Sequence, residues 1–507
     1  MKHPSILIGP LTGIVCALLM CGCVRSLPTV QTPSIKDVVG SAFSTGDHVQ
    51  FTRATAADAL MNHRAKPITA VFPNRHLTLT ECRRAALANN LDIQVARMDE
   101  FTKRAVEYSN RTKLLPHVMF SGDLSERDNP QYSYSDVLGR EGEQPSPGSS
   151  GTGVTNFSTG HERSTERFSL EARWSPTDAA LAYYLTKSSA NDSTKSHYTR
   201  MRVAQKILAM VDGAYFRLLS LQSCLPKARN LVRARSTVAE RMKTAFNRKL
   251  ASVEDYNRAA QNLIRAQRLY TRVKNEVEKQ RNLLASAMAI SPERCVDGGF
   301  LLVGDLEPPK FDMAVCNMEM VAVQNRPEAF EAGLNHISSL NDLKRTVVKY
   351  LPKLSGYWRY NRDKDKFLYN KEWKEVGLSV YFDLVDWLSN AKEYEAAGAN
   401  SAKTRREVGS VAVGIASQVR TAAIQFHDAQ DELQSTQSAF TSSNEVMRIA
   451  KDRQSRDDLD KLALEEARAN MLQNDLERTK ALGETNATLA ELQGAMGINY
   501  TEPPNHP

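Results

Sequence analysis

The sequence predicts an α+β membrane protein that is internally duplicated. We expect each copy to supply four β-strands to a twelve-stranded β-barrel shared by three copies, and its long helices to continue that barrel as an α-helical barrel. Three observations lead to this prediction: a pattern that recurs in both halves of the 507-residue chain, four strands with one apolar and one polar face, and two very long helices.

The N-terminal segment has the features of an export signal. A basic start precedes an apolar run that ends in Cys21-Gly22-Cys23. A small residue before a cysteine resembles the lipobox of bacterial lipoproteins, in which Cys23 would carry the covalent lipid, palmitate included. The absence of Asp at position 24, which is Val24, favours delivery to the outer membrane in that group of proteins. Cleavage before Cys21 and ordinary signal cleavage without a lipid are the alternatives.

Internal repetition sets the expected organisation of the chain. Two offsets, 236 and 208 positions, relate the halves, and they differ by the extra length of the first inter-strand loop. The aligned segments are Leu87–Asp92 with Val323–Glu328, Leu115–Pro116 with Leu351–Pro352, and Leu170–Ser175 with Leu378–Asp383. The expected parts are a signal peptide (1–22), an N-terminal arm (23–76), a first repeat (77–290), an equatorial linker (291–313), a second repeat (314–497) and a C-terminal tail (498–507).

Four segments alternate between apolar and polar residues, which is typical of strands with one apolar and one wet face. The apolar even-numbered residues are Val118, Phe120, Leu124, Phe168, Leu170, Ala172, Trp174, Leu354, Trp358, Tyr360, Val376, Leu378, Val380 and Phe382. A soluble sheet packed on a core has the same alternation. However, all four tryptophans lie in or beside these segments, as an interfacial aromatic girdle would place them. Residues 130–163, rich in Gly, Ser, Pro and Asp, are expected to form an exposed loop.

Two helices are longer than an ordinary domain accommodates. They are expected over residues 177–246 and 386–453, and at 1.5 Å per residue each would reach roughly 100 Å. Pro226 should kink the first helix, because proline removes one backbone donor. Capping spacings predict two helix starts, Thr78 with Glu81 and Ser252 with Asp255.

Four strands cannot close a barrel, and an open sheet edge in lipid leaves backbone groups unpaired at a cost of several kcal/mol each. Three copies would supply twelve strands, an even number within the range of membrane barrels. The long helices would then continue the pore with the same symmetry. The copies must therefore share one barrel.

Several function classes are excluded by the residues. There is no phosphate-binding loop, no metal-spaced histidine pair and no nucleophile elbow, so we expect no enzyme, no metal and no cofactor other than the lipid. The net charge is +8, but basic and acidic residues alternate, and nucleic acid is therefore not an expected partner. Cys295 and Cys316 flank one irregular segment and would pair in an oxidising compartment; free thiols are the alternative.

The ordered combination of these segments resembles the TolC-like outer-membrane efflux protein family, in its lipoprotein branch. The resemblance covers nearly everything from Leu77 to Gly497. It rests on the following segments: Leu77–Glu81, Asn325–Glu328, the Leu-Pro before each first strand, and Phe382–Asp383. It implies a homotrimeric outer-membrane channel subunit of a tripartite efflux system, which extends into the periplasm and exports small molecules with a periplasmic adaptor and an inner-membrane pump.

Two other functions remain open at this point. An exit duct of a type I protein secretion system would have the same architecture. A periplasmic coiled-coil structural lipoprotein without a pore is the rival from a different class.

The resemblance also implies that the two helix–helix turns form the pump-side opening. The residues expected to contact the adaptor or line the aperture are Arg248, Lys249, Leu250, Arg453, Arg456, Asp457, Asp458 and Asp460. The family usually has an Arg-x-x-x-Gly-Leu signature here, whereas neither turn contains glycine; Lys249-Leu250 and Asp458-Leu459 stand nearest. In a trimer the aspartates would form acidic rings that favour cations. A solvated charged turn without a gating role is the alternative.

Overall fold

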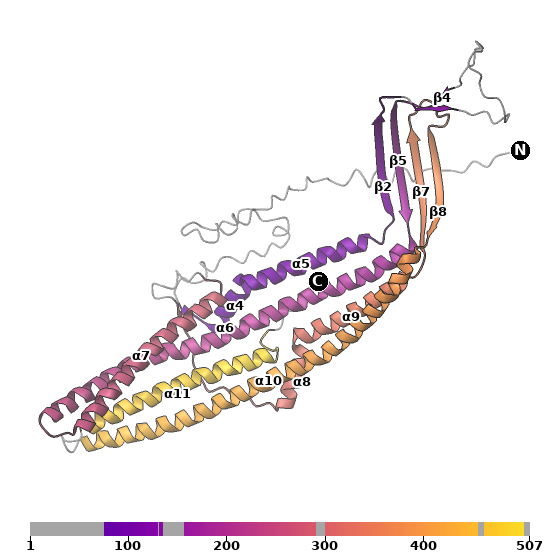
Figure 1. Cartoon of the computed structure of the whole chain (residues 1–507). Coiled ribbons are helices and arrows are strands. Elements are labelled where there is room, and N and C mark those ends of the chain that lie inside the picture. The colour runs from indigo at the N-terminus through magenta and orange to yellow at the C-terminus, as the bar shows by residue number, and fades with distance from the viewer. Residues whose placement is uncertain (1–75, 130, 135–156, 291–299, 455–460, 501–507) are drawn as a thin grey trace, which may run out of the picture. The chain divides into compact units, whose positions relative to one another are not determined.

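The computed structural model describes residues 76–129, 131–134, 157–290, 300–454 and 461–500. Most of these residues are helical, and one four-stranded sheet and two small two-stranded sheets complete the fold (Figure 1). The first half contains α4 (Leu79–Asn89), α5 (Leu91–Thr112), β2 (His117–Glu126), β5 (Ser164–Trp174), α6 (Pro176–Asn247) and α7 (Val253–Ala287). The second half contains α8 (Val315–Asn325), α9 (Pro327–Val348), β7 (Lys353–Asp363), β8 (Glu372–Tyr381), α10 (Leu384–Gln454) and α11 (Lys461–Ala495).

Both halves have the same order of elements: two short helices, two strands and two long helices. Buried core residues repeat at the two offsets found in the sequence. The equivalent pairs are Ala86 with Ala322 at an offset of 236, and Val211 with Val419, Leu284 with Leu492 and Met288 with Met496 at an offset of 208. The duplication therefore includes the packing of the core as well as the order of elements.

The four long strands form one antiparallel sheet in the order β2-β5-β7-β8. Within each half the two strands are neighbours, and the pairing of β5 with β7 joins the halves. Part of the segment that we expected to be a loop is instead a short hairpin, formed by β3 (Gln131–Tyr134) and β4 (Phe157–His161). The expectation of a loop over all of 130–163 is therefore wrong, because local pairing continues the β2–β5 hairpin.

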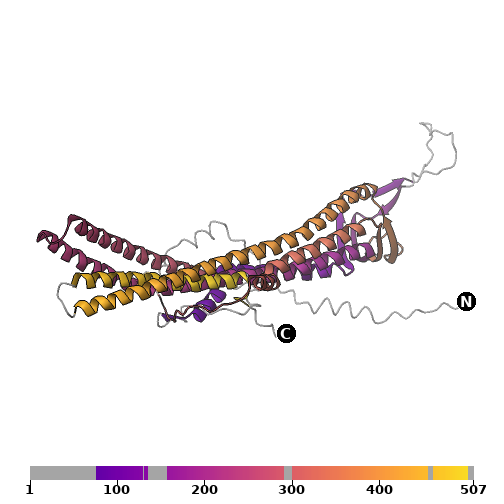
Figure 2. The same cartoon turned by 90° about the horizontal axis from the view of Figure 1, so that it is seen from below.

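Helix α6 has 72 residues and α10 has 71, close to the predicted bounds. The first half of α6 packs against α5 and α9, and its second half packs against α7 and α11 (Figures 1 and 2). Ser175 starts α6, since its hydroxyl accepts a hydrogen bond from the backbone N–H of Asp178 at 3.1 Å and Pro176 occupies the first helical position. The helix continues through Pro226.

The two predicted helix starts are confirmed. Thr78 and Glu81 form a complete capping box at the start of α4, and the hydroxyl of Ser252 accepts from the backbone N–H of Asp255 at 3.0 Å. Strand β1 (His76–Leu77) ends two residues before α4 begins. It pairs in parallel with β6 (Leu301–Leu302).

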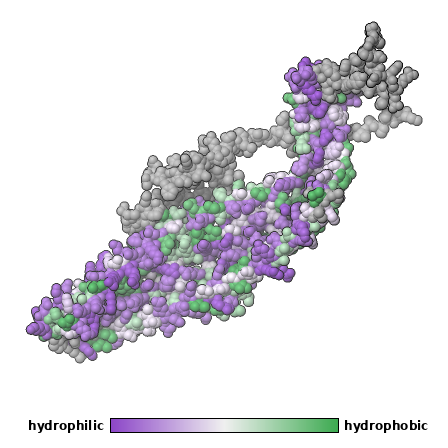
Figure 3. Space-filling view, in the orientation of Figure 1, coloured by the Kyte–Doolittle hydropathy of each residue, from purple (hydrophilic) through white to green (hydrophobic). Residues whose placement is uncertain are grey.

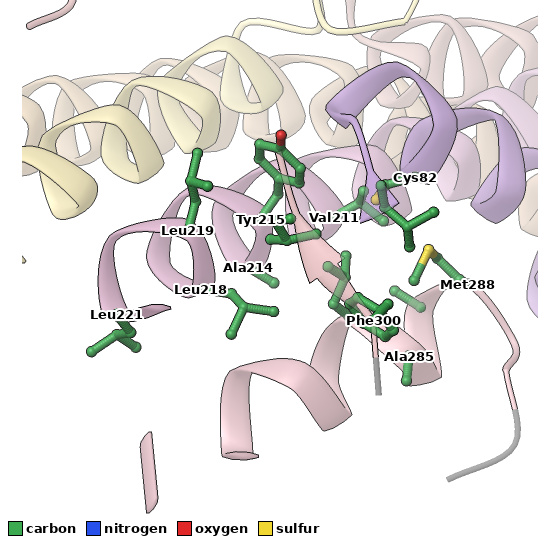
Figure 4. Close-up of a cluster of buried hydrophobic side chains, with 14 of the residues drawn as sticks. Cys82, Val211, Ala214, Tyr215, Leu218, Leu219, Leu221, Ala285, Met288 and Phe300 are labelled. Atoms are coloured by element: carbon green, nitrogen blue, oxygen red, sulfur yellow. The ribbon is translucent and has the colours of Figure 1, made fainter. Parts of the chain in front are cut away.

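The largest buried core lies where α4, the middle of α6, the end of α7 and β6 meet. Cys82 of α4, Val211 and Tyr215 of α6, Met288 at the end of α7 and Phe300 just before β6 converge there (Figure 4). The hydroxyl of Tyr215 donates to a backbone carbonyl 2.7 Å away, which satisfies this polar group inside the core. Such a core anchors the short helix α4 to the long helix α6.

Candidate functional site: the sheet and the helix-turn end

One face of the sheet is apolar and exposed. The register places Val118, Ala172, Trp358 and Val376 in one row across the four strands. Val118 is 67% exposed and Val376 is 80% exposed. Exposed apolar patches of this extent mark contact with lipid or with another protein. This face therefore has the character of a lipid-facing surface.

The apolar band has a defined height. From Leu354 to Tyr360 it spans about 20 Å at 3.3 Å per residue, close to the ~25 Å of the lipid-facing band of membrane barrels. Toward the loops the same face becomes charged, and Figure 3 shows hydrophilic side chains gathered at that end of the sheet. The charged residues of this face are Glu166, Arg362, Glu372 and Lys374.

The four tryptophans lie in or beside the strands as predicted, but not on one face. Trp174 and Trp358 belong to the apolar face, whereas Trp373 is paired with Asn361 in a row of polar residues. Trp387 lies in the first turn of α10. The expected girdle is therefore incomplete within one copy, because the register places Trp373 on the other face of the sheet.

The opposite face of the sheet is held by polar pairs. Arg359 donates to Glu171 at 2.7 and 2.9 Å and lies 3.4 Å from Glu375. Glu171 also accepts from Arg173 at 2.7 Å. Hydroxyl pairs bridge neighbouring strands: Ser121 with Ser169 and Ser125 with Thr165 at 2.7 Å, and Ser355 with Ser379 at 2.6 Å. Such a face suits the water-filled side of a membrane sheet.

The turn between α6 and α7 carries three of the predicted site residues. Arg248, Lys249 and Leu250 are all exposed, and the side chain of Leu250 is 78% exposed. Lys249 has a φ of 58°, the left-handed conformation that glycine favours. The backbone N–H groups of Lys249 and Leu250 donate to the carbonyls of Phe246 and Ala245, both at 2.8 Å. This pattern is a Schellman helix end, in which Lys249 occupies the place of the expected glycine.

The structure brings the predicted site residues together only in part. Arg453 is exposed at the end of α10, and Cys316 is exposed in α8. The remaining predicted residues, Cys23, Cys295, Arg456, Asp457, Asp458 and Asp460, lie outside the described residues. The lipid anchor, the disulfide and the acidic rings therefore stay predictions.

Sequence reasoning missed the ion pairs that fasten the helices to one another. Arg83 holds Asp212 through two bonds of 2.7 Å, and Arg217 holds Glu484 at 2.8 Å and Glu491 at 2.9 Å. Burial raises the pKa of Asp212 and the hydrogen bonds from Arg83 oppose that rise. Each pair joins residues more than a hundred positions apart, so no local signal in the sequence points to it.

Among the described residues, no cluster of histidine, cysteine or carboxylate side chains has the arrangement of a metal site. Within the same part of the chain, no helix is both long enough and apolar enough to cross a membrane.

The fold is that of outer-membrane channels. A crystal structure of a membrane protein from Pseudomonas aeruginosa matches with a TM-score of 0.65 and 16% identity, over 83% of this chain and 93% of that chain. The CmeC outer membrane channel of Campylobacter jejuni matches with a TM-score of 0.66 and 14% identity, over 83% and 86%. The MtrE outer membrane channel of Neisseria gonorrhoeae, solved in its open state, matches with a TM-score of 0.62 and 16% identity, over 83% and 89%.

The family comparison agrees with the fold. Residues 321–498 match the model of the outer membrane efflux protein family. Curated protein sequences yield no match. The resemblance to the TolC-like outer-membrane efflux proteins is therefore confirmed, by the family model in the second half and by the fold over most of the chain. Because the matched family and structures are channels, the prediction that the chain is not an enzyme is confirmed on the same basis.

Proposed function

We propose that three copies of this chain close a twelve-stranded barrel in the outer membrane and form an efflux duct. The observation that carries this proposal is the sheet itself. Its apolar face is exposed, and among the described residues the outer edges of β2 and β8 are not paired with any strand. Every pairing in the sheet is antiparallel, so β8 of one copy runs antiparallel to β2 of the next. Closure removes both edges, as lipid requires.

The helices next to the sheet follow the same order as the strands. Contacts link α5 to α6, α6 to α9 and α9 to α10, which matches the order β2-β5-β7-β8. The edge helices α5 and α10 are joined directly to the edge strands β2 and β8. A ring of strands from three copies would therefore be continued by a ring of helices with the same symmetry. The polar face of the sheet would line the lumen.

The helix-turn end is the proposed docking surface for a periplasmic adaptor and, through it, an inner-membrane pump. At the α6–α7 turn, the exposed Leu250 follows the cationic Arg248 and Lys249 directly. An apolar side chain beside fixed positive charge suits a partner surface with an apolar pocket and acidic rim. In this system the exported cargo would be small molecules.

The membrane anchor is proposed at Cys23. The barrel would already hold the trimer in the membrane, and acyl chains would add firm attachment to the inner leaflet. Metabolic labelling with palmitate tests this: the wild-type protein should incorporate label and Cys23→Ser should not. Label retained in Cys23→Ser would refute the proposed anchor at Cys23 and would leave the channel proposal unaffected.

Conductance in planar bilayers, together with electron microscopy of the same purified full-length protein, tests the channel. We expect discrete conductance steps and particles with threefold symmetry. Monomeric particles that give no steps would refute the proposal and favour a spacer without a pore.

A turn variant tests adaptor docking separately. Leu250→Glu should lower adaptor capture from membranes at unchanged conductance, and Lys279→Glu, an exposed reversal elsewhere on α7, should not. Equal capture by the two variants would contradict docking at this turn.

A further inference from the structure

Two ion pairs at equivalent positions of the duplication have opposite polarity. Arg83 of α4 and Glu319 of α8 are related by the offset of 236, and Asp212 of α6 and Arg420 of α10 by the offset of 208. In the first half Arg83 donates to Asp212 from Nε and Nη2, both at 2.7 Å. In the second half Nε of Arg420 donates to Oε1 of Glu319 at 3.0 Å, and Nη2 of Arg420 lies 2.7 Å from the same oxygen. The contact is the same and its charges are reversed.

The apolar contacts around these two pairs are partly the same and partly different in the two halves. They differ in size at Cys82 against Met318 and at Tyr215 against Ala423. Each short helix presents a buried alanine, Ala86 or Ala322, and each long helix presents a buried valine, Val211 or Val419. The ends of α7 and α11 complete the two cores with the same residue types, a leucine and a methionine: Leu284 and Met288 in one half, Leu492 and Met496 in the other. Apolar burial is not directional, so the positions that are the same favour neither short helix, whereas the positions that differ in size favour the native pairing.

We infer that the reversed ion pairs select which short helix docks on which long helix. If α4 docked on α10, Arg83 would face Arg420. If α8 docked on α6, Glu319 would face Asp212. Like charges in contact disfavour both exchanged arrangements, whereas both native arrangements are attractive. The polarity reversal therefore adds a charge-based preference for the native partners to the differences in side-chain size between the two cores.

The first pair has the greater discriminating power, because Asp212 is fully buried. Its side chain is 0% exposed, against 21% for Glu319. A second carboxylate opposite Asp212 would leave two acids in a site without a countercharge, which is far more costly than a like-charge contact in water. The docking of α4 on α6 thus depends more strongly on the Arg83–Asp212 pair than the docking of α8 on α10 depends on the Arg420–Glu319 pair.

The selection acts within one chain and between chains alike. A duplicated protein that assembles with copies of itself offers each short helix several similar surfaces, and exchange of identical elements between copies is a known hazard. The inference does not depend on pore formation, since all four charged residues belong to one chain.

Charge swaps at constant net charge test the inference. The crossed variant R83E/E319R places like charges at both native contacts and attractive charges at both exchanged ones. The compensated variant R83E/D212R/E319R/R420E reverses both pairs and restores attraction at the native contacts. Both variants keep the net charge of +8. A neutral variant, R83Q/E319Q, removes both pairs without repulsion.

The measurement is hydrogen exchange of residues 79–89 and 315–325 in the purified full-length protein. We expect exchange in the crossed variant to be faster than wild type by about 10-fold or more, with the neutral variant between them, and the compensated variant to return to within about 3-fold of wild type. Equal exchange in the crossed and neutral variants would overturn the inference. If the crossed variant fails to fold, the compensated variant decides: its recovery supports selection by charge, and its failure refutes it.

Discussion

The orientation of the sheet can be tested with one arginine on each face. Val376 lies in the middle row of the apolar face, beside Trp358 on β7, and its side chain is 80% exposed in a single copy. If this face meets lipid, Val376→Arg places a charge in hydrocarbon. Ser379→Arg, three residues away on the polar face, places the same charge in the water-filled lumen.

The expected magnitudes follow from depth in the bilayer. An arginine near the midplane costs about 2–4 kcal/mol in a membrane barrel, and about 0–1 kcal/mol near an interface. Three copies would multiply the midplane cost to roughly 6–12 kcal/mol per trimer. Val380 lies next to the end of β8 at Tyr381, so Val380→Arg should cost less than Val376→Arg. Ser379→Arg loses one hydroxyl pair to Ser355, worth about 1 kcal/mol.

Urea titrations of trimers folded into lipid vesicles measure these costs. Wild type should be the most stable. Ser379→Arg and Val380→Arg should be slightly less stable and close to each other, and Val376→Arg should be clearly the least stable. Two results would refute the reasoning: equal loss at positions 376 and 379, or a larger loss at 379. Either would mean that the apolar face is covered by protein and does not meet lipid.

Two substitutions and one labelling experiment probe the helical part. Lys249→Gly should stabilise the protein by about 1 kcal/mol in urea titrations, because glycine adopts the positive φ without strain; an unchanged midpoint would contradict the helix-end geometry. Burial would raise the pKa of Glu328, but hydrogen bonds from the neighbouring Arg326 and from its own backbone leave this pKa below the usual value. The Glu328 carboxylate therefore stabilises the fold above the ordinary pKa of glutamate, and this stabilisation is lost as the pH falls through the lowered pKa. Glu328→Gln should therefore be less stable than wild type by about 1 kcal/mol at neutral pH, and the difference should shrink as the pH falls below the ordinary pKa of glutamate and through the lowered pKa of Glu328. Burial raises the pKa of Cys82 and of Cys224 to about 12, so maleimide at mildly alkaline pH should leave both thiols unlabelled in the folded protein. Cys316 is exposed, and its labelling only after reduction would indicate that it forms a disulfide.

Local patterns were sufficient to predict the four long strands and the two longest helices of this protein, but not the β3–β4 hairpin. Alternation with a period of two identified β2, β5, β7 and β8. The helical pattern identified α6, in spite of Pro226, and α10, which has no proline, to within a few residues. The capping box at Thr78 and the N-cap hydrogen bond of Ser252 are also local, because the interacting groups are three residues apart. The duplication was visible because two segments of one chain can be compared directly.

The candidate site was less predictable. The charged residues of the α6–α7 turn were found through the resemblance to the efflux proteins. No local sequence pattern predicted that Lys249 takes the left-handed conformation in place of glycine. That conformation follows from the way α6 must end so that α7 can pack back along it, which lets two carbonyls of the last turn find donors.

By itself, the sequence determined where strands and long helices occur, that they occur twice, and that four strands in each copy leave a barrel open. These features depend on residues close together in the chain or on comparison of the chain with itself. Only the tertiary structure decided the face on which Trp373 lies, the partner of each charge, and the reversal between Arg83–Asp212 and Arg420–Glu319. Such pairs join residues about a hundred positions or more apart, and their energies depend on burial and on distances of a few ångströms, which packing sets and composition does not.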